Sequence, residues 1–306
     1  MDLPIRNVIS MRDFDREGIL HVLQHAAEME DDAPIRLLEG CVLGIMFAEP
    51  STRTRLSFAS AMMKLGGQVL DFGAPERSSF QKGESLGDTI RTIAGYCDVL
   101  TIRHSWEGTA RRASEISSVP VINAGDGANQ HPTQTFLDLY TIQTTCEKID
   151  GLNIGFVGDL RFSRTVHSLA EALSHFDARQ YFASPATLHL PSHVGERLDE
   201  RSVHWKEYDG LSEILPELDV LYCTRIQEER FADRMEYEQV KSSYRVDREL
   251  LRDCGAQEEL KIMHPLPRVD ELSEDLDDTP HAVYFQQAHN GIPVRQALLS
   301  MVLGKV

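Results

Sequence analysis

The sequence of 306 residues lacks any long apolar stretch. No uninterrupted run approaches the roughly 18 apolar residues that a membrane-spanning helix requires, and the first residues lack the apolar centre of a secretory signal. With 42% hydrophobic and 26% charged residues, the composition is that of an ordinary globular protein. We therefore predict no membrane partner and expect a cytoplasmic location.

Paired cysteines are also missing. The five cysteines are widely separated, and none forms a Cys-x-x-Cys pair. This spacing argues against both a zinc site and a disulfide framework. We expect reduced, mostly buried thiols and predict no metal site.

Positive charge is scarce in this chain. Asp and Glu number 48 against 31 Lys and Arg, which gives a formal net charge of −17. Such a protein repels a phosphate backbone, so nucleic acid is not expected as a partner. A segment with an excess of positive charge is therefore unusual in this chain. Residues 51–68 contain Arg53, Arg55 and Lys64 and no acid, which predicts an anion site.

That basic segment begins where an apolar strand pattern ends. Residues 42–47 have the composition of a buried strand, Pro50 stops it, and Ser51-Thr52-Arg53-Thr54-Arg55 opens an amphipathic helix. Backbone N–H groups, hydroxyls and both guanidinium groups would then converge at the positive end of the helix dipole. The alternative is an ordinary capped helix with solvated arginines.

Further basic or amide side chains directly follow other predicted strands, where ligands bind in open parallel sheets. For His131, which precedes a helix opened by Pro132, the alternative is a structural histidine. For Lys82, on the polar loop 73–83, the alternative is a solvated lysine. The strand-end candidates are Arg103 after 99–102, His131 and Gln134 after 119–122, Arg164 after 152–157, and Arg225 and Gln227 after 219–223.

The segment His264-Pro265-Leu266-Pro267-Arg268 also follows a predicted strand. Its two prolines stiffen the backbone and remove donors, so the carbonyls of Pro265 and Leu266 are left to accept from a ligand; the alternative is a purely structural turn. A nicotinamide site is not expected, because residues 155–158 lack the third glycine of the dinucleotide fingerprint. The candidates include no paired carboxylates and no Ser-His-Asp set, which favours charge stabilisation over covalent catalysis and predicts no cofactor.

Four stretches together resemble the aspartate/ornithine carbamoyltransferase family, and the resemblance extends from about residue 5 to residue 303. Members that act on ornithine characteristically carry Ser-Met-Gly in the second domain and His-Cys-Leu-Pro in place of residues 264–267, and neither is present. An ornithine or other amino-acid carbamoyltransferase, or a catalytically inactive ligand-binding homologue, stays an alternative. The four stretches are Ser51 to Arg55, His131-Pro132-Thr133-Gln134, His264 to Arg268, and Phe285-Gln286-Gln287-Ala288.

The resemblance implies an α/β fold of two domains. Each domain is a mostly parallel sheet flanked by helices, with the active site in the interdomain cleft. Residues 1–132 plus 288–306 would bind carbamoyl phosphate, and residues 133–287 would bind aspartate. From the apolar pattern we expect a last strand over 283–285 and a closing helix over 294–302.

The resemblance also implies a reaction, in which carbamoyl phosphate and L-aspartate give N-carbamoyl-L-aspartate and phosphate on the route to pyrimidines. Ser51, Thr52, Arg53 and Thr54 would hold the phosphate. Thr54, Arg103 and His131 would polarise the carbamoyl carbonyl, while Gln134 and the carbonyls of Pro265 and Leu266 would fix its amino group. Arg164, Arg225 and Gln227 would clamp the aspartate carboxylates.

In this family the active unit is a homotrimer with shared sites. The positions Ser78 and Lys82 match residues that reach into the neighbouring subunit, and a separate zinc-containing regulatory chain is a further candidate partner. The sequence departs from some members at Arg161-Phe162-Ser163, where lysine, tyrosine and glycine are common. Arg161 is an expected ion-pair partner for Glu236 when the domains close.

Overall fold

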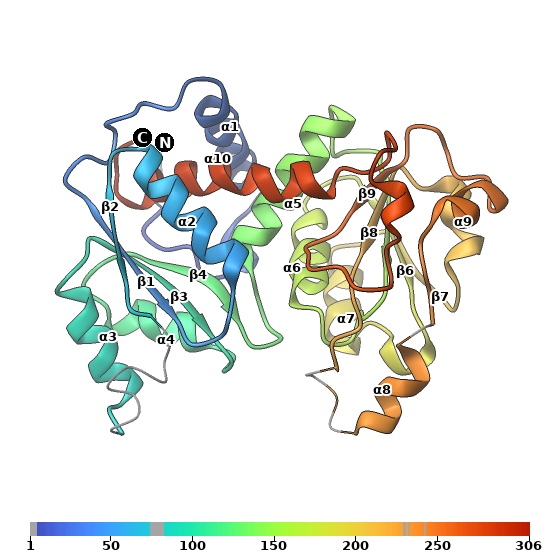
Figure 1. Cartoon of the computed structure of the whole chain (residues 1–306), viewed down its shortest axis with the longest axis horizontal. Coiled ribbons are helices and arrows are strands. Elements are labelled where there is room, and N and C mark those ends of the chain that lie inside the picture. Colours follow the sequence, from blue (N-terminus) through green and yellow to red (C-terminus); the bar gives the residue numbers. More distant parts are fainter. Residues whose placement is uncertain (1–4, 74–82, 229–230, 232, 242) are drawn as a thin grey trace. The chain divides into compact units, whose positions relative to one another are not determined.

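The computed structural model describes residues 5–73, 83–228, 231, 233–241 and 243–306. It contains two compact units (Figure 1). One comprises residues 1–140 and 290–306, and the other comprises residues 141–289. The chain therefore passes from one unit to the other within helix α5, Pro132–Cys146, and within helix α10, Tyr284–Val302.

The first unit is built on a four-stranded parallel sheet of order β2-β1-β3-β4. Since parallel crossovers are right-handed, the reversal of direction after β2 puts α2 on one face of the sheet and α3 and α4 on the other. Its elements are α1 Arg16–Asp32, β1 Val42–Phe47, α2 Thr52–Lys64, β2 Gln68–Asp71, α3 Leu86–Ala94, β3 Val99–His104, α4 Thr109–Ile116 and β4 Val121–Asp126, preceded by a short 3-10 turn, Met11–Asp13.

The second unit has a five-stranded parallel sheet of order β7-β6-β5-β8-β9. Its regular elements are β5 Asn153–Val157, α6 Arg164–Leu173, β6 Arg179–Ala183, α7 Ser192–Glu200, β7 Trp205–Tyr208, β8 Val220–Cys223, α8 Arg234–Val240, α9 Arg248–Asp253 and β9 Lys261–Met263; short 3-10 turns cover Ala186–Leu188, Leu211–Glu213, Leu215–Glu217 and Glu274–Leu276.

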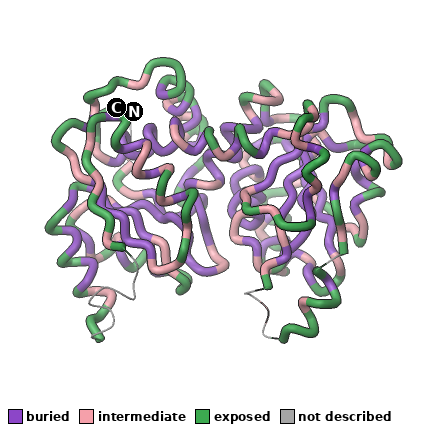
Figure 2. The backbone as a smooth tube through the Cα atoms, in the orientation of Figure 1, coloured by how far each residue is buried: buried purple, intermediate pink, exposed green. Residues whose placement is uncertain are grey.

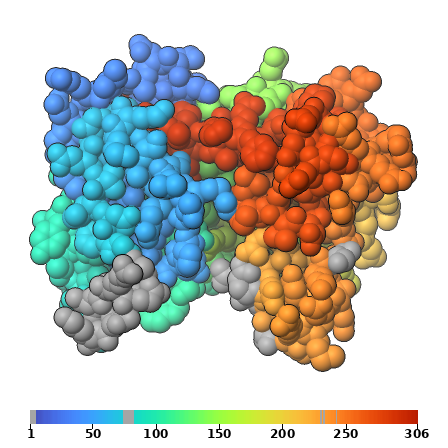
Figure 3. Space-filling view, viewed as in Figure 1, coloured from blue at the N-terminus to red at the C-terminus, as the bar shows by residue number. Residues whose placement is uncertain are grey.

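Burial explains why the central strands form. Parallel strands covered by helices on both faces are continuously apolar rather than alternating. Strand β8 is buried at all four positions, and β1 is buried at every position after its first. Figure 2 shows this as buried strands surrounded by helices with exposed outer faces. Helix α2 is an example, because its Leu56 and Met63 are exposed and it forms part of the surface in Figure 3.

Both sheets contain a point where the strand order reverses. In the first it lies between β1 and β3, whose ends pair at Phe47 and Arg103. In the second it lies between β5 and β8, whose ends pair at Val157 and Cys223. Neighbouring loops leave the sheet in opposite directions at such a point and open a crevice in which ligands bind.

The expected strand over 283–285 is wrong. The pairing here is a single isolated bridge between Ala282 and Ile262 of β9, and helix α10 begins at Tyr284. The helix then continues through Pro293, which the sequence pattern suggested as its boundary. Almost every residue of α10 from Asn290 to Val302 is buried, so tertiary packing outweighs the hydrogen bond that proline removes.

Among the helices that the structure describes, none has the combined length and apolarity needed to cross a bilayer. All five cysteines are free thiols, and Cys97 and Cys223 are buried.

Candidate functional site

The start of α2 carries the proposed phosphate ligands. Ser51 occupies the N-cap position with extended backbone, and its side chain makes no capping hydrogen bond. Thr52 and Arg53 are exposed, whereas Thr54 is buried. The first-turn N–H groups of a helix lack intrahelical partners, so this end of α2 offers donors and a partial positive charge to an anion. The predicted helix start is confirmed.

The prediction that Arg55 joins this anion turn is wrong. Its Nη1 lies 3.5 Å from Oδ2 of Asp71, at the end of β2. Its guanidinium also lies over the ring of Phe47, 5.7 Å from the ring centre. Arg55 therefore pairs with a carboxylate of its own unit, a contact that the local sequence pattern does not reveal.

Arg103, near the end of β3, contacts groups that belong to the two neighbouring strands or follow them. Its side chain is only 14% exposed, its Nε lies 3.4 Å from Glu49 Oε2, and its Nη1 donates to the Ala124 carbonyl at 3.2 Å. Glu49 belongs to the turn after β1, and Ala124 lies in β4. A guanidinium is planar and has five donors, so these contacts orient its plane.

The loop after β4 is held by a buried aspartate. Asp126 accepts from the side chain of Asn123 at 3.0 Å and from the backbone N–H of Gln130 at 3.1 Å and of Gly108 at 2.8 Å. His131 follows, is 4% exposed, and stands immediately before Pro132, the first residue of α5. Pro132 is thus at the first helical position, as predicted.

Gln134 lies in the first turn of α5 and is half-buried. Its Nε2 donates to Oδ1 of Asp138 at 2.9 Å, one turn further along the same helix. Five predicted ligands belong to the first unit and lie at or after the ends of the neighbouring strands β1, β3 and β4. They are Arg53, Thr54, Arg103, His131 and Gln134.

In the second unit, the loops after β5 and β8 approach each other closely. Gly158 has φ +117°, and a Cβ atom there would lie 2.1 Å from the Thr224 carbonyl oxygen. Only glycine fits that approach. The Thr224 hydroxyl accepts from the backbone N–H of Asp159 at 3.1 Å. The turn that leads to Arg164 is therefore fixed to the turn that carries Arg225 and Gln227.

Asp159 is a fully buried carboxylate at this junction. Burial raises its pKa to about 6, although nearby backbone N–H groups of Phe162, Gln227 and Arg161 and the charge of Arg225 act in the opposite direction. The Phe162 N–H donates to Oδ1 at 2.9 Å. Asp159 thus links the segment before α6 to Arg225 electrostatically.

The three predicted aspartate ligands follow the ends of strands β5 and β8 in the second unit. Arg164 is the first residue of α6, while Arg225 and Gln227 follow β8, and all three are half-buried. They stand on the two loops that flank the β5/β8 reversal point. Two guanidinium groups and an amide at one edge suit a ligand with two carboxylates.

The turn after β9 is held by a buried imidazole. His264 Nδ1 accepts the Leu266 N–H at 2.8 Å, so Nε2 carries the ring proton and donates to Glu271 Oε1 at 2.8 Å. Burial raises the pKa of Glu271, but the contacts with His264 more than offset this and leave it lowered. Leu266 has φ +55°, so the pair supports a backbone conformation that leucine rarely adopts.

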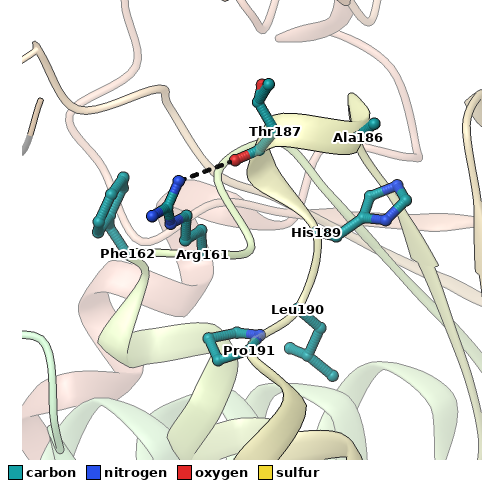
Figure 4. A pocket seen from close by; sticks show the side chains of 7 residues that line it. All are labelled: Arg161, Phe162, Ala186, Thr187, His189, Leu190 and Pro191. Atoms are coloured by element: carbon teal, nitrogen blue, oxygen red, sulfur yellow. Dashed lines mark hydrogen bonds between the residues drawn. The ribbon is translucent and has the colours of Figure 1, made fainter. Parts of the chain in front are cut away.

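A pocket of about 470 Å³ lies beside residues 161–163, the segment in which the sequence differs from some family members (Figure 4). Arg161 and Phe162 stand on one side of it and His189 on the other. Arg161 Nη1 donates to the Thr187 carbonyl at 3.4 Å. Arg161 contacts this carbonyl in the present structure, and its pairing with Glu236 on domain closure stays a prediction.

Two predicted site residues, Ser78 and Lys82, lie outside the residues that the structure describes. Within the described ranges, no group of three or more His, Cys, Asp or Glu side chains is arranged to hold a metal ion.

Comparison with known proteins identifies the family. The family description "Aspartate/ornithine carbamoyltransferase, carbamoyl-P binding domain" matches residues 6–144, and "Aspartate/ornithine carbamoyltransferase, Asp/Orn binding domain" matches residues 150–302. The chain belongs to the aspartate/ornithine carbamoyltransferase family.

Relatives in this carbamoyltransferase family are similar over nearly their whole length. The aspartate carbamoyltransferase catalytic subunit of Thermococcus gammatolerans is 54% identical, over 99% of each chain. The catalytic subunit of M. jannaschii aspartate transcarbamoylase is 51% identical, covers 98% of each chain and superposes with a TM-score of 0.89.

A solved aspartate transcarbamoylase of Trypanosoma cruzi is 37% identical, with coverage of 96% of this chain and 94% of that one and a TM-score of 0.91. That protein was solved in complex with N-(phosphonacetyl)-L-aspartic acid.

The sequence did not reveal the carboxylates that contact the proposed cationic ligands or act on them electrostatically. Glu49 beside Arg103 and Asp159 near Arg225 looked like ordinary loop residues. Asp138 was detectable, because its spacing of four from Gln134 puts both on one face of a helix. The charge of Asp138 also acts on Arg295, which lies 157 residues further along the chain, and no local pattern connects the two.

Replacing Asp159 by asparagine tests the buried carboxylate. An acid with a pKa raised in the folded state binds more protons there, so its contribution to stability declines as pH rises from the unfolded value near 4 to about 6. We expect the stability of Asp159→Asn relative to wild type to increase by on the order of 3 kcal/mol between pH 4 and 7. Urea denaturation at several pH values measures this difference. A difference independent of pH would contradict the electrostatic account of Asp159.

Proposed function

We propose that the protein transfers the carbamoyl group of carbamoyl phosphate to the amino group of L-aspartate, giving N-carbamoyl-L-aspartate and phosphate in pyrimidine biosynthesis. The observation that carries this proposal is the pair of reversal points. Each has basic side chains at the ends of its strands, in a protein whose net charge is −17. Family membership and the curated relatives, which are aspartate carbamoyltransferase catalytic subunits, support it.

In this proposal the first unit binds carbamoyl phosphate. Ser51, Thr52, Arg53 and Thr54 surround the phosphate at the N-terminus of α2, where N–H groups and forked guanidinium donors suit its oxygens. Arg103 bridges phosphate and carbonyl. Its contacts with Glu49 and Ala124 hold it in place before the substrate arrives, which lowers the entropic cost of binding.

The same unit stabilises the charge that develops during transfer. Thr54, Arg103 and His131 donate to the carbamoyl carbonyl oxygen as it becomes an oxyanion. Gln134, with the carbonyls of Pro265 and Leu266, accepts from the carbamoyl amino group. Preorganised donors of this type accelerate acyl transfer without a covalent intermediate on the enzyme.

The second unit binds L-aspartate through Arg164, Arg225 and Gln227. The aspartate nitrogen attacks the carbamoyl carbon, and the bond from that carbon to the phosphate oxygen breaks. None of the proposed ligands is an evident general base. The departing phosphate therefore accepts the proton that the amine loses, and atoms and charges balance without a cofactor.

The second substrate should be L-aspartate and not L-ornithine. Arg164 and Arg225 attract a second carboxylate, whereas the ornithine side-chain ammonium would be repelled by both. Phosphate release with carbamoyl phosphate and each amino acid measures the preference. We expect a kcat/KM for aspartate at least about a hundredfold higher, equivalent to roughly 2.7 kcal/mol. A higher kcat/KM for ornithine would contradict the assignment.

We further propose that the active unit is a cytoplasmic homotrimer, with Ser78 and Lys82 of one subunit completing the site of the next. The family resemblance supports this arrangement, and head-to-tail interfaces in a closed ring allow each site to take one loop from its neighbour. A separate zinc-containing regulatory chain is a candidate additional partner.

Mixed trimers test the sharing of sites. Arg53→Ala and Lys82→Ala variants should each be nearly inactive alone. In randomly reassembled trimers, about a quarter of the sites would combine an intact Arg53 with an intact Lys82 from the neighbouring subunit. Activity should recover to roughly that fraction of wild type. No recovery in mixtures shown by mass to contain hybrids would contradict sharing.

A further inference from the structure

A buried carboxylate determines which way the amide of Gln134 faces. Asp138 is fully buried, and its Oδ1 accepts from Gln134 Nε2 at 2.9 Å. An ionised carboxylate only accepts hydrogen bonds, so the nitrogen of the glutamine amide must point to it. The amide oxygen of Gln134 is then directed away from Asp138.

The charges of Arg295 and Asp138 attract each other. Arg295 is 2% exposed, and burial lowers its pKa to about 10 while the charge of Asp138 raises it. The guanidinium is therefore still a cation at neutral pH. Two buried groups of opposite charge favour each other's ionised form, so removing either charge would leave the other less compensated.

Arg295 is itself fixed by groups from two helices. Its Nη1 donates to Ser57 Oγ at 2.8 Å and to the Gly291 carbonyl at 3.0 Å. Its guanidinium lies over Phe58, 5.0 Å from the ring centre. Ser57 and Phe58 belong to α2, whose first turn carries Arg53 and Thr54. Hydrogen bonds thus join α2 to Arg295 and Gln134 to Asp138, and the charges of Arg295 and Asp138 act on each other.

We propose that Asp138 is a positioning residue that determines specificity for the carbamoyl group. It commits the nitrogen of Gln134 to the protein, so the oxygen is the atom that faces the substrate and accepts from the carbamoyl amino group. This inference rests on the role proposed above for Gln134. It predicts discrimination against an acyl phosphate of the same shape that carries a methyl group in place of the amino group, namely acetyl phosphate.

The physical basis is the cost of an unmade hydrogen bond. A site that presents an acceptor to an amino group discriminates strongly against an analogue without that donor. If Gln134 turned its own nitrogen to the substrate, donor would face donor and this preference would disappear. Asp138→Asn permits both orientations, because a neutral amide donates as well as accepts.

The experiment compares carbamoyl phosphate with acetyl phosphate as donors to L-aspartate, by phosphate release corrected for hydrolysis. For Asp138→Asn we expect kcat/KM with carbamoyl phosphate to fall about tenfold and that with acetyl phosphate to change little. The ratio of the two then falls about tenfold. Gln143→Ala removes a glutamine from the same helix outside the proposed site and should leave the ratio unchanged.

A double-mutant cycle separates positioning from a merely structural role. Gln134→Ala should lower the same ratio, and Asp138→Asn should lower it no further in that background. Because Asp138→Asn leaves Arg295 without its carboxylate, the neutral pair Asp138→Asn with Arg295→Gln provides a second variant. It should show the same loss of discrimination, and it replaces the single variant if that protein does not fold.

The outcomes are distinguishable. Wild-type protein that releases no phosphate with carbamoyl phosphate and aspartate would contradict the proposed function itself. Active wild type, with Asp138 variants that weaken both donors equally or add their effect to that of Gln134→Ala, would overturn only the positioning role.

Discussion

Parallel strands present all their carboxyl ends at one edge of a sheet, and this constraint decides where every proposed strand-end ligand lies. At the β1/β3 reversal point, the N-terminus of α2 follows β1, and Arg103 lies near the end of the neighbouring strand β3. At the β5/β8 reversal point, Arg164 and the loop with Arg225 do so. An acidic chain can thereby concentrate cations and helix N-termini where two anionic substrates are needed, although its overall field opposes them.

In both units, carboxylates contact arginine side chains or act on them electrostatically. Glu49 contacts Arg103, Asp138 acts on Arg295, and Asp159 lies near Arg225. A guanidinium has enough donors to bind a carboxylate of the protein and still face a ligand. Such carboxylates fix the orientation of a group more than they neutralise it. In the first unit, Arg295 of α10 donates to Ser57 of α2, and Asp138 accepts from Gln134 within α5.

Local patterns in the sequence predicted much of this arrangement. The apolar run before Pro50, the hydroxyls after it and the first-turn proline at 132 identified strand and helix boundaries, because those signals act within a few residues. Contacts between distant segments were not predictable. Arg55 of α2 pairs with Asp71 at the end of β2, and Arg295 donates to Ser57, which lies 238 residues earlier in the chain. Burial allows α10 to continue through Pro293. The ends of strands could thus be inferred, but not what holds their side chains.

In the proposed reaction, the turn at residues 51–54 binds the phosphate. Calorimetric binding of N-(phosphonacetyl)-L-aspartate to Arg53→Ala tests it most directly, with Arg55→Ala as the matched control because that guanidinium is engaged by Asp71. Loss of a charge-assisted contact costs roughly 1.5–3 kcal/mol. Arg53→Ala should therefore bind about ten to a hundred times more weakly, while Arg55→Ala should bind nearly as wild type does. A folded Arg53→Ala protein with unchanged affinity would contradict the account.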